Sequence, residues 1–496
     1  MNVVDTQYGR TGQLTAALAG GQVSAAELTE AAIARIERFE PLLHAVCVRD
    51  FARARDAARE ADRALARGER RPLLGVPLLV KESFNVAGLP TTWGFPQHSD
   101  FVADQDALVV ARAKAAGAVV LGKTNVPVGL GDWQSYNEIY GTTSNPWDLA
   151  RSPGGSSGGS AAALAAGYAP LALGSDIGGS LRVPAHFCGV FAHKPSLGIV
   201  PGRGHLPPPF AALPDTPDLA VVGPMARCAT DLELLLDVMA GPDEWDLGVA
   251  YRLELPPPRH RRLAQHRVLV VDRHPLVPTS DAVRQAIDQL ATRLAGSGVQ
   301  VSRHSELLPD LADCGRLYGR MLLSFFAANL PEPGYAELRE QAARLPAGDT
   351  TARAERLRAS VLSHRDWIAA SQQRNRLRAR WREFFRAFDA LICPVSPVVA
   401  FAHDHSDMEG RRLDIDGVEV PYGDQIAWSG LATLPGLPAT AIPIARSEQG
   451  LPIGVQIIGP WLEDRTPLRL AQLLETEFGG FTPPPLSPDA PPPARR

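Results

Sequence analysis

Two serines and one lysine are the residues of this chain best suited to covalent chemistry. Glycine-serine segments at residues 154–160 (GGSSGGS) and 175–182 (SDIGGSLR) flank an alanine-rich stretch that predicts a short buried helix. Far upstream, Lys81 follows the apolar run VPLLV, in a chain where only four of the 50 Lys and Arg residues are lysine. A buried lysine can lose its proton, whereas arginine stays charged at any working pH. We therefore expect Lys81 to be a base that activates a serine nucleophile.

The glycines next to these serines suggest a use for the backbone itself. Consecutive backbone N–H groups can point into a cavity where no Cβ blocks the approach, and such a row stabilises a developing oxyanion. Ile177, Gly178, Gly179 and Ser180 supply a row of this kind. A flexible linker is the alternative, but the helix-forming AAALAA follows GGSSGGS at once. We expect an oxyanion hole formed by these four amides.

Other motifs favour packing over chemistry. Residues 117–124 (GAVVLGKT) match the phosphate-loop pattern GxxxxGK[ST], but AVVL favours a strand and the following Asn-Val-Pro does not begin a helix. Cys188 stands in apolar sequence without an evident base, which favours a packed thiol. We find no metal-ligand spacing among the three histidines His186, His193 and His205. We expect no metal ion and no organic cofactor.

Composition is that of an ordinary globular protein. The 496 residues are 45% hydrophobic and 21% charged, with a net charge of −4. Arginines alternate with acidic residues, as in residues 51–70, so no basic stripe for nucleic acid is expected. Five scattered cysteines predict no disulfide framework. Since neither a secretory signal nor an apolar run of about 18 residues is visible, we expect no membrane partner and a cytoplasmic location.

Short apolar runs alternate with helical stretches along the chain. Two helices are expected within residues 11–39, the second opened by the capping-box pair Ser24 and Glu27, and a third over residues 51–67. The run LLGVPLLV at residues 73–80 fits a strand buried on both faces. This alternation predicts an α/β fold with a mixed central β-sheet surrounded by helices. Further strands are expected at residues 118–121, 268–271, 391–393, 440–444 and 454–458, and further helices at residues 230–240, 281–294 and 466–477.

The chain is expected to form a single large domain over residues 1–480. Its parts are N-terminal helices over residues 1–70, a catalytic core over residues 71–240, a helical excursion over about residues 309–388, and a closing sheet segment over residues 389–480. Residues 331–334 (PEPG) should break the excursion into separate helices. Residues 481–496 form a proline-rich tail that we expect to be extended or disordered.

Several motifs together resemble the amidase signature family. The run from GVPLLVKESFNVAGLPTT through GKTNVP, YGTTSNPWD, SPGGSSGGSAAALAAG and GSDIGGSLRVPA carries the resemblance, and PGLPATAIPI with GLPIGVQIIG is similar to the family's closing segment. The motifs stand in the family's order over residues 24–477, with Ser156 following Lys81 by 75 residues and preceding Ser180 by 24. The resemblance implies the amidase signature fold.

The resemblance also implies a Ser-Ser-Lys triad. Ser180 is then the nucleophile, Ser156 is the bridging serine, preceded in the family by a cis peptide bond, and Lys81 is the base. Asp176 and Arg182 stand where the family uses polar groups to hold the nucleophile loop. Glu82 follows the lysine where the family often has Asp. Because neighbouring side chains on a strand point to opposite faces, Glu82 need not pair with Lys81.

The activity implied is hydrolysis of a carboxylic amide C–N bond through an acyl-serine intermediate, a chemistry that extends to esters and carbamates. The expected partner is a small-molecule amide. The oligomeric state is left open, with a homodimer as one candidate. The alternative is the glutaminase (A) subunit of a tRNA-dependent amidotransferase, which works with partner subunits and releases ammonia from glutamine. A catalytically inactive binding protein is disfavoured because all three triad positions are filled.

The substrate pocket is the least determined feature. Leu130, Trp133, Tyr136 and Tyr140 lie in the segment GLGDWQSYNEIYGTT before the glycine loop and are candidates to line the pocket. Packing beneath that loop is an equally open role for them. Trp133 and the proline-rich residues 206–210 would suit an apolar or aromatic acyl group.

Overall fold

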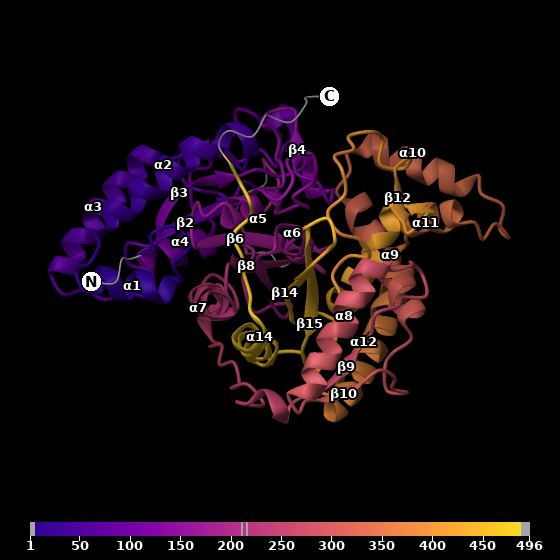
Figure 1. The fold of residues 1–496 in the computed structure, drawn as a ribbon. Helices are drawn as coiled ribbons and strands as arrows, with labels where there is room; N and C mark the ends of the chain where they lie inside the picture. Colours follow the sequence, from indigo (N-terminus) through magenta and orange to yellow (C-terminus); the bar gives the residue numbers. More distant parts are fainter. Residues whose placement is uncertain (1–4, 210–211, 215–216, 488–496) are drawn as a thin grey trace.

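The short apolar runs of the sequence lie side by side in one sheet. In the computed structural model, which describes residues 5–209, 212–214 and 217–487, eleven strands form one mixed sheet (Figure 1). In spatial order they are β1 (Val46–Arg49), β3 (Val119–Thr124), β2 (Pro77–Lys81), β6 (Leu171–Asp176), β8 (Val221–Ala226), β7 (Phe191–Lys194), β14 (Ala439–Arg446), β15 (Pro452–Ile458), β11 (Ala390–Pro394), β9 (Arg267–Val270) and β10 (Gln300–Ser302).

The sheet combines parallel and antiparallel pairs, so the expected mixed α/β architecture is confirmed. Strand β2 runs parallel to both β3 and β6, and β9 runs parallel to β10 and β11. The remaining neighbours are antiparallel. The strands predicted from apolar runs are present as β2, β3, β9, β11, β14 and β15. Residues 119–124 of the phosphate-loop match form β3, as the AVVL sequence indicates.

The N-terminal helices follow the predicted pattern. Ser24 Oγ accepts a hydrogen bond from the Glu27 amide, and the Glu27 carboxylate accepts one from the Ser24 amide, so the predicted capping box is confirmed. The α-helices are α1 (Thr11–Ala19), α2 (Ala25–Leu43), α3 (Phe51–Ala66), α4 (Leu108–Ala115), α5 (Gly158–Ala165), α6 (Arg182–Cys188), α7 (Ala229–Met239), α8 (Asp281–Gly296), α9 (Leu311–Ala328), α10 (Glu332–Ala343), α11 (Ala352–Ser360), α12 (His364–Ala387), α13 (Ile426–Thr433) and α14 (Arg465–Phe478).

Helices α5 and α6 lie against the middle of the sheet, and every residue of both is buried. Helix α5 contacts β2, β3 and β6, and α6 contacts β14 and β15. Helices α7 and α14 pack against each other next to β8 and β14, and the Thr11 amide at the start of α1 donates to Asp231 of α7. Helices α1 to α3 lie on the side of the molecule away from α10 and α11 (Figure 1). The small residues of α5 allow its close approach to the strands that carry the predicted site.

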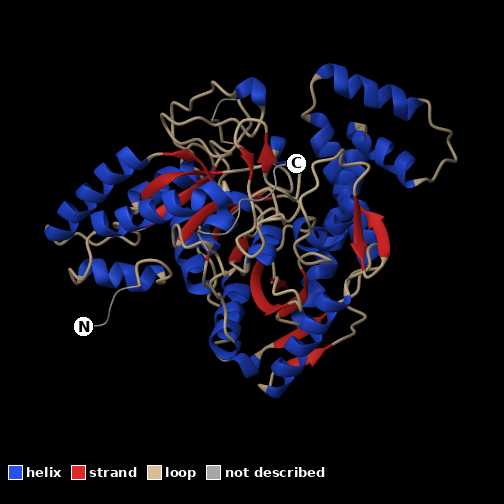
Figure 2. Cartoon of the chain, turned by 45° about the horizontal axis from the view of Figure 1, so that its top comes forward, coloured by secondary structure: helices blue, strands red, loops and turns tan. Residues whose placement is uncertain are grey.

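The helical excursion is present as α9 to α12. Helix α9 ends at Ala328 and α10 begins at Glu332, with Pro331 as its N-cap residue, so the predicted break is confirmed at its proline. Pro333 and Gly334 lie within the first turn of α10. The helix accommodates Pro333 because a proline at the start of a helix removes no intrahelical hydrogen bond. Helices α10 and α11 form an arm beside α9, away from the sheet (Figures 1 and 2).

Short elements that the sequence analysis did not predict complete the fold. They are the hairpins β4 (Tyr136–Asn137) with β5 (Gly141–Thr142) and β12 (Arg412–Ile415) with β13 (Val418–Pro421), and the 3₁₀ turns Pro96–His98, Val128–Leu130, Leu247–Val249, Leu263–Gln265 and Tyr422–Gln425. None of the helices within the described ranges has the length and apolar character to cross a membrane. Residues 488–496 of the proline-rich tail lie outside the described residues.

Candidate active site

Three segments far apart in the sequence meet at one edge of the sheet. Strand β2 ends at Lys81, and its parallel neighbour β6 ends at Ser175 and Asp176. Because parallel neighbours end at the same edge, Lys81 lies beside the loop that carries Ser180. The third segment is the loop before α5, which holds Ser156. The strand register therefore places Lys81 beside the end of β6 that leads to Ser180, and Ser156 approaches Lys81 from the loop before α5.

Lys81 lies in the interior with 0% of its surface exposed. Its Nζ is 2.7 Å from Ser156 Oγ and 3.0 Å from Ser175 Oγ. Burial lowers the pKa of Lys81 to about 7, against an opposing effect of the Asp176 carboxylate. A lysine in this environment supplies free base at neutral pH.

The peptide bond between Gly155 and Ser156 is cis, as the resemblance implies. A Cβ at Gly155 would lie 2.3 Å from the carbonyl oxygen of Asp132 and 2.5 Å from that of Gln134. Only glycine fits this close approach of two backbones. The amide of Ser157 donates a hydrogen bond of 3.2 Å to the Ser180 carbonyl, which joins the two serine loops directly.

Asp176 and Arg182 hold the loop around Ser180. The Asp176 carboxylate accepts hydrogen bonds from the Gly179 and Leu181 amides at 2.9 and 3.1 Å. The Arg182 guanidinium lies 2.9 Å from the same carboxylate, and both side chains are buried. Burial would raise the pKa of Asp176, but Arg182 lowers it to about 2. The ionised pair fixes both ends of the turn that presents Ser180.

Two aromatic side chains fix the carbonyl groups of this loop. Tyr318 Oη donates to the Ile177 carbonyl at 2.6 Å, and Trp133 Nε1 donates to the Gly178 carbonyl at 2.8 Å. In a trans peptide the N–H points opposite to the C=O. The Gly178 amide is therefore directed away from Tyr318. The Gly179 amide is directed to Asp176, so one of the four amides of the expected row is occupied.

Ser180 lines a cavity of about 1590 Å³. The lining also includes Leu130, Trp133, Ile177 and Gly178. The cavity gives Ser180, only 6% exposed, access to a small molecule.

Two residues of the predicted pocket have other partners. Tyr136 accepts a hydrogen bond from Arg411 at 2.8 Å and stacks on His405, and Tyr140 Oη lies 3.4 Å from the Glu82 carboxylate. Neither tyrosine is among the lining residues of the cavity. The part of the segment that follows Trp133 is folded into the β4–β5 hairpin, where both tyrosines lie. Of the proline-rich residues 206–210, residue 210 lies outside the described residues, and residues 206–209 are not among the lining residues.

Comparison with known proteins identifies the family, since the Amidase family profile matches residues 27–468. The chain belongs to the amidase signature family. It is 32% identical to fatty-acid amide hydrolase 2-A of Danio rerio, over 95% of this chain and 89% of the relative. It is 37% identical to the A-type subunit of glutamyl-tRNA(Gln) amidotransferase from Anaeromyxobacter dehalogenans, over 95% of this chain and 96% of the relative. A crystal structure of an amidase, 28% identical, superposes with a TM-score of 0.74 over 95% of this chain and 100% of the other.

The protein is thus a hydrolase of amide C–N bonds. In this amidase Glu82 faces away from Lys81, as strand alternation predicts. Its carboxylate accepts hydrogen bonds from the backbone amides of Thr92 and Trp93. Burial raises the pKa of Glu82, and the buried Lys123 opposes that rise. Glu82 therefore shapes the neighbouring turn and does not contact the lysine.

The histidines of this amidase have partners that fit a packing role. His186 lies 3.0 Å from the Val398 carbonyl, His193 lies 2.9 Å from Thr440 Oγ1, and His205 lies 3.0 Å from Ser83 Oγ.

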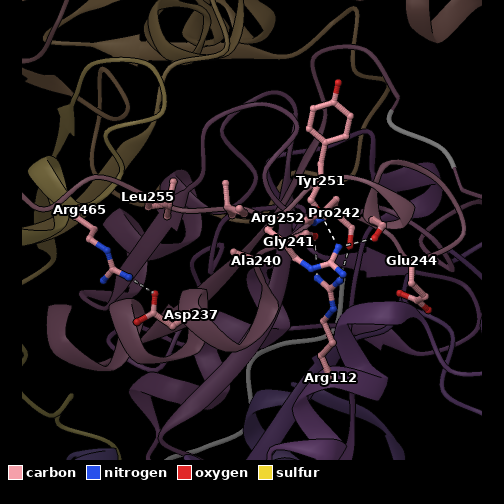
Figure 3. Close-up of a pocket in the computed structure, with 12 residues that line it drawn as sticks. Arg112, Asp237, Ala240, Gly241, Pro242, Glu244, Tyr251, Arg252, Leu255 and Arg465 are labelled. Carbon is pink, nitrogen blue, oxygen red and sulfur yellow. Dashed lines mark hydrogen bonds and ion pairs between the residues drawn. The ribbon is translucent and has the colours of Figure 1, made fainter.

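A second cavity of about 590 Å³ includes none of the predicted site residues in its lining (Figure 3). There Arg112 donates to backbone carbonyls, and Arg465 pairs with Asp237. Of these two cavities, the larger one includes the predicted nucleophile Ser180 in its lining.

Sequence reasoning missed two residues of this amidase that contact the site. Ser175 stands in the SDIGGS motif at the end of β6, and the rule that parallel strands end at one edge could have placed it beside Lys81. Tyr318 lies in α9, which was predicted only as part of the helical excursion. No sequence signal links Tyr318 to Ile177, because the contact depends on how α9 packs.

Proposed function

We propose that this amidase cleaves a carboxylic amide through an ester formed on Ser180, with Lys81 as base and Ser156 as the proton relay. The observation that carries the proposal is the fully buried Lys81 amine, 2.7 Å from Ser156 Oγ and with a pKa of about 7. An uncharged amine in that position can take a proton that a serine hydroxyl releases.

The first half of the reaction forms the ester. Ser180 Oγ bonds to the carbonyl carbon while its proton passes to Ser156, whose own proton passes to Lys81. The amides of Gly178 and Ser180 stabilise the oxyanion, with Tyr318 and Trp133 holding the loop carbonyls away. The C–N bond then breaks as Lys81 returns the proton through Ser156 to the leaving amine.

The second half uses water. Water attacks the ester carbonyl and gives a proton through Ser156 to Lys81, and the proton then returns to Ser180 as the acid leaves. The net reaction converts one amide and one water into one carboxylic acid and one amine, so all atoms are accounted for. The same steps cleave esters and carbamates, with water as the only reactant besides the substrate.

We favour a free-standing amidase over the glutaminase component of an amidotransferase, although the A-type subunit from Anaeromyxobacter dehalogenans is 37% identical. Ile426 Cδ1 and Tyr318 Oη lie within 4 Å of the position of a Cβ on Gly178, so an apolar and an aromatic side chain flank the loop. Glutamine would need partners for its charged ammonium and carboxylate groups. The nearby carboxylate of Asp132 is already held by Arg411 and Tyr422.

The experiment is a comparison of rates for an aryl anilide, an aryl ester, a carbamate and glutamine. We expect hydrolysis of the anilide by the isolated chain, its loss in Ser180→Ala, and full activity in the control Ser99→Ala at an exposed serine. Ammonia release from glutamine without anilide hydrolysis would contradict the proposal in favour of the glutaminase subunit. Equal anilide turnover by Ser180→Ala would contradict the assigned nucleophile.

A further inference from the structure

One face of α9 forms a continuous wall of the cavity at Ser180. Its lining residues recur at helical spacing: Gly315, Arg316, Gly319, Arg320, Leu322, Leu323 and Phe326. The wall begins beside Tyr318, which holds the Ile177 carbonyl next to the nucleophile loop. At 1.5 Å per residue it continues for about 12 Å to Phe326. The cavity therefore extends well beyond the scissile bond.

Gly319 leaves open space in this wall. A Cβ at Gly319 would meet no atom within 4 Å, and its backbone conformation is accessible to any residue. Glycine inside a helix is less favourable than alanine. Neither packing nor backbone geometry accounts for a glycine here, whereas room for a ligand does.

Further lining residues come from α10, from α11, which packs against α9, and from the segment that follows them. They include Tyr335, Ala359, Val361 and Leu362. The apolar lining includes the buried Leu322 and Ala359, 3% and 6% exposed, and the more open Phe326, 39% exposed. Of the charged lining residues on this side, four are exposed and Arg358 is half-buried; the exposed ones are Arg339, Glu355, Arg356 and Asp366. The lining of this channel thus combines apolar side chains with charged ones, most of which are exposed.

We propose that this channel binds an elongated apolar group of the amide substrate and that Gly319 is the residue that keeps it open. The inference rests on the proposed function, because it takes Ser180 as the point of attack. An apolar chain that leaves water for such a channel gains binding with each methylene buried. The preferred substrates are then amides of long aliphatic or extended aryl groups, on either the acyl or the amine side.

The test uses two series of amides. In one, the acyl group of an anilide lengthens from acetyl to decanoyl; in the other, the amine of an acetamide lengthens from methyl to decyl. We expect kcat/KM to rise about threefold to fourfold per methylene in one series, which identifies the side that enters the channel. In Gly319→Leu the ratio of kcat/KM for the longest to the shortest member of that series should fall at least 30-fold. The matched control Gly296→Leu changes a helical glycine with equally open surroundings outside the cavity and should keep the wild-type ratio.

Two results would overturn the inference: a kcat/KM independent of length in both series, or a wild-type ratio in a folded Gly319→Leu. The shortest substrate reports any disturbance of the neighbouring Tyr318, so the ratio isolates the channel. If Gly319→Leu fails to fold, Leu323→Trp narrows the same wall and is judged by the same ratio. Hydrolysis of short amides that requires Ser180 would leave the proposed function standing even where the channel fails.

Discussion

The phenol of Tyr318 donates a hydrogen bond of 2.6 Å to the carbonyl oxygen of Ile177, 141 residues away in the sequence. Tyr318 is fully buried on α9, and its ring packs against Gly430, where a Cβ would lie 2.5 Å from the ring. The contact joins the helical excursion to the nucleophile loop. It orients the peptide unit whose N–H belongs to Gly178, one of the amides expected to meet the oxyanion.

Removing the Tyr318 hydroxyl tests this positioning role. We expect Tyr318→Phe to lower kcat about tenfold, the value of one lost hydrogen bond, with KM nearly unchanged because the ring still packs. Steady-state kinetics on an aryl anilide separate the two constants. Tyr251→Phe at an exposed tyrosine is the control. A rise in KM at constant kcat would instead place Tyr318 in substrate binding.

The pH dependence of kcat/KM should follow the titration of Lys81. Because the neutral amine is the active form and its pKa is about 7, activity should rise about tenfold per pH unit below 7 and level off above it. A pH profile of kcat/KM from 5.5 to 9 measures the midpoint. Burial lowers the pKa of His205 to about 3, so that histidine stays neutral throughout.

A second buried lysine provides the control for this profile. Burial also lowers the pKa of Lys194 to about 7, and its amine donates to the Pro195 carbonyl. Lys194→Met should keep the same midpoint. A flat profile for the wild type, or loss of the rise in Lys194→Met, would contradict the assignment to Lys81.

The buried pair of Asp176 and Arg182 should contribute to stability as well as to the site. Arg182 also donates to Gln456 and Thr433, so it joins the nucleophile loop to β15 and α13. Arg182→Met leaves the Asp176 carboxylate buried without a cation, and we expect it to lower the free energy of unfolding by about 3 to 5 kcal/mol. Denaturant titration measures the change.

An exposed ion pair serves for comparison. Arg344 and Glu340 lie on the surface of α10, with side chains 78% and 69% exposed. Arg344→Met should change the free energy of unfolding by less than about 1 kcal/mol. Similar effects of the two arginine substitutions would show that burial of the Asp176 pair carries no extra stability.

The sequence indicated the parts of this site that depend on local pattern. An apolar run before Lys81 predicts a buried strand, and glycines around Ser156 and Ser180 predict tight backbone, so both features could be recognised without coordinates. The mixed sheet also followed from alternating strands and helices, although β1, β6, β7, β8 and β10 were not predicted. Their apolar runs are short or contain Gly, Pro, His or Lys, and pairing with neighbours decides their conformation.

Contacts between distant segments were beyond sequence reasoning. Tyr136 and Tyr140 belong to the predicted pocket segment, yet the β4–β5 hairpin gives them other partners, Arg411 and Glu82. Likewise, the open space at Gly319 is visible only in the folded chain, where this residue of α9 lines the cavity. Such features depend on which faces meet in the folded chain, and a linear pattern does not specify that.

The most direct test of the account is capture of the covalent intermediate. The substrate is an activated aryl ester that acylates the enzyme faster than the acyl-enzyme is hydrolysed. Mixed with the enzyme and quenched within one turnover, it should add the mass of one acyl group to the protein. Peptide mass mapping should place that acyl group on Ser180, and Lys81→Met should not accumulate it. An acyl group on another residue, or normal acylation of Lys81→Met, would contradict the Ser180, Ser156 and Lys81 mechanism.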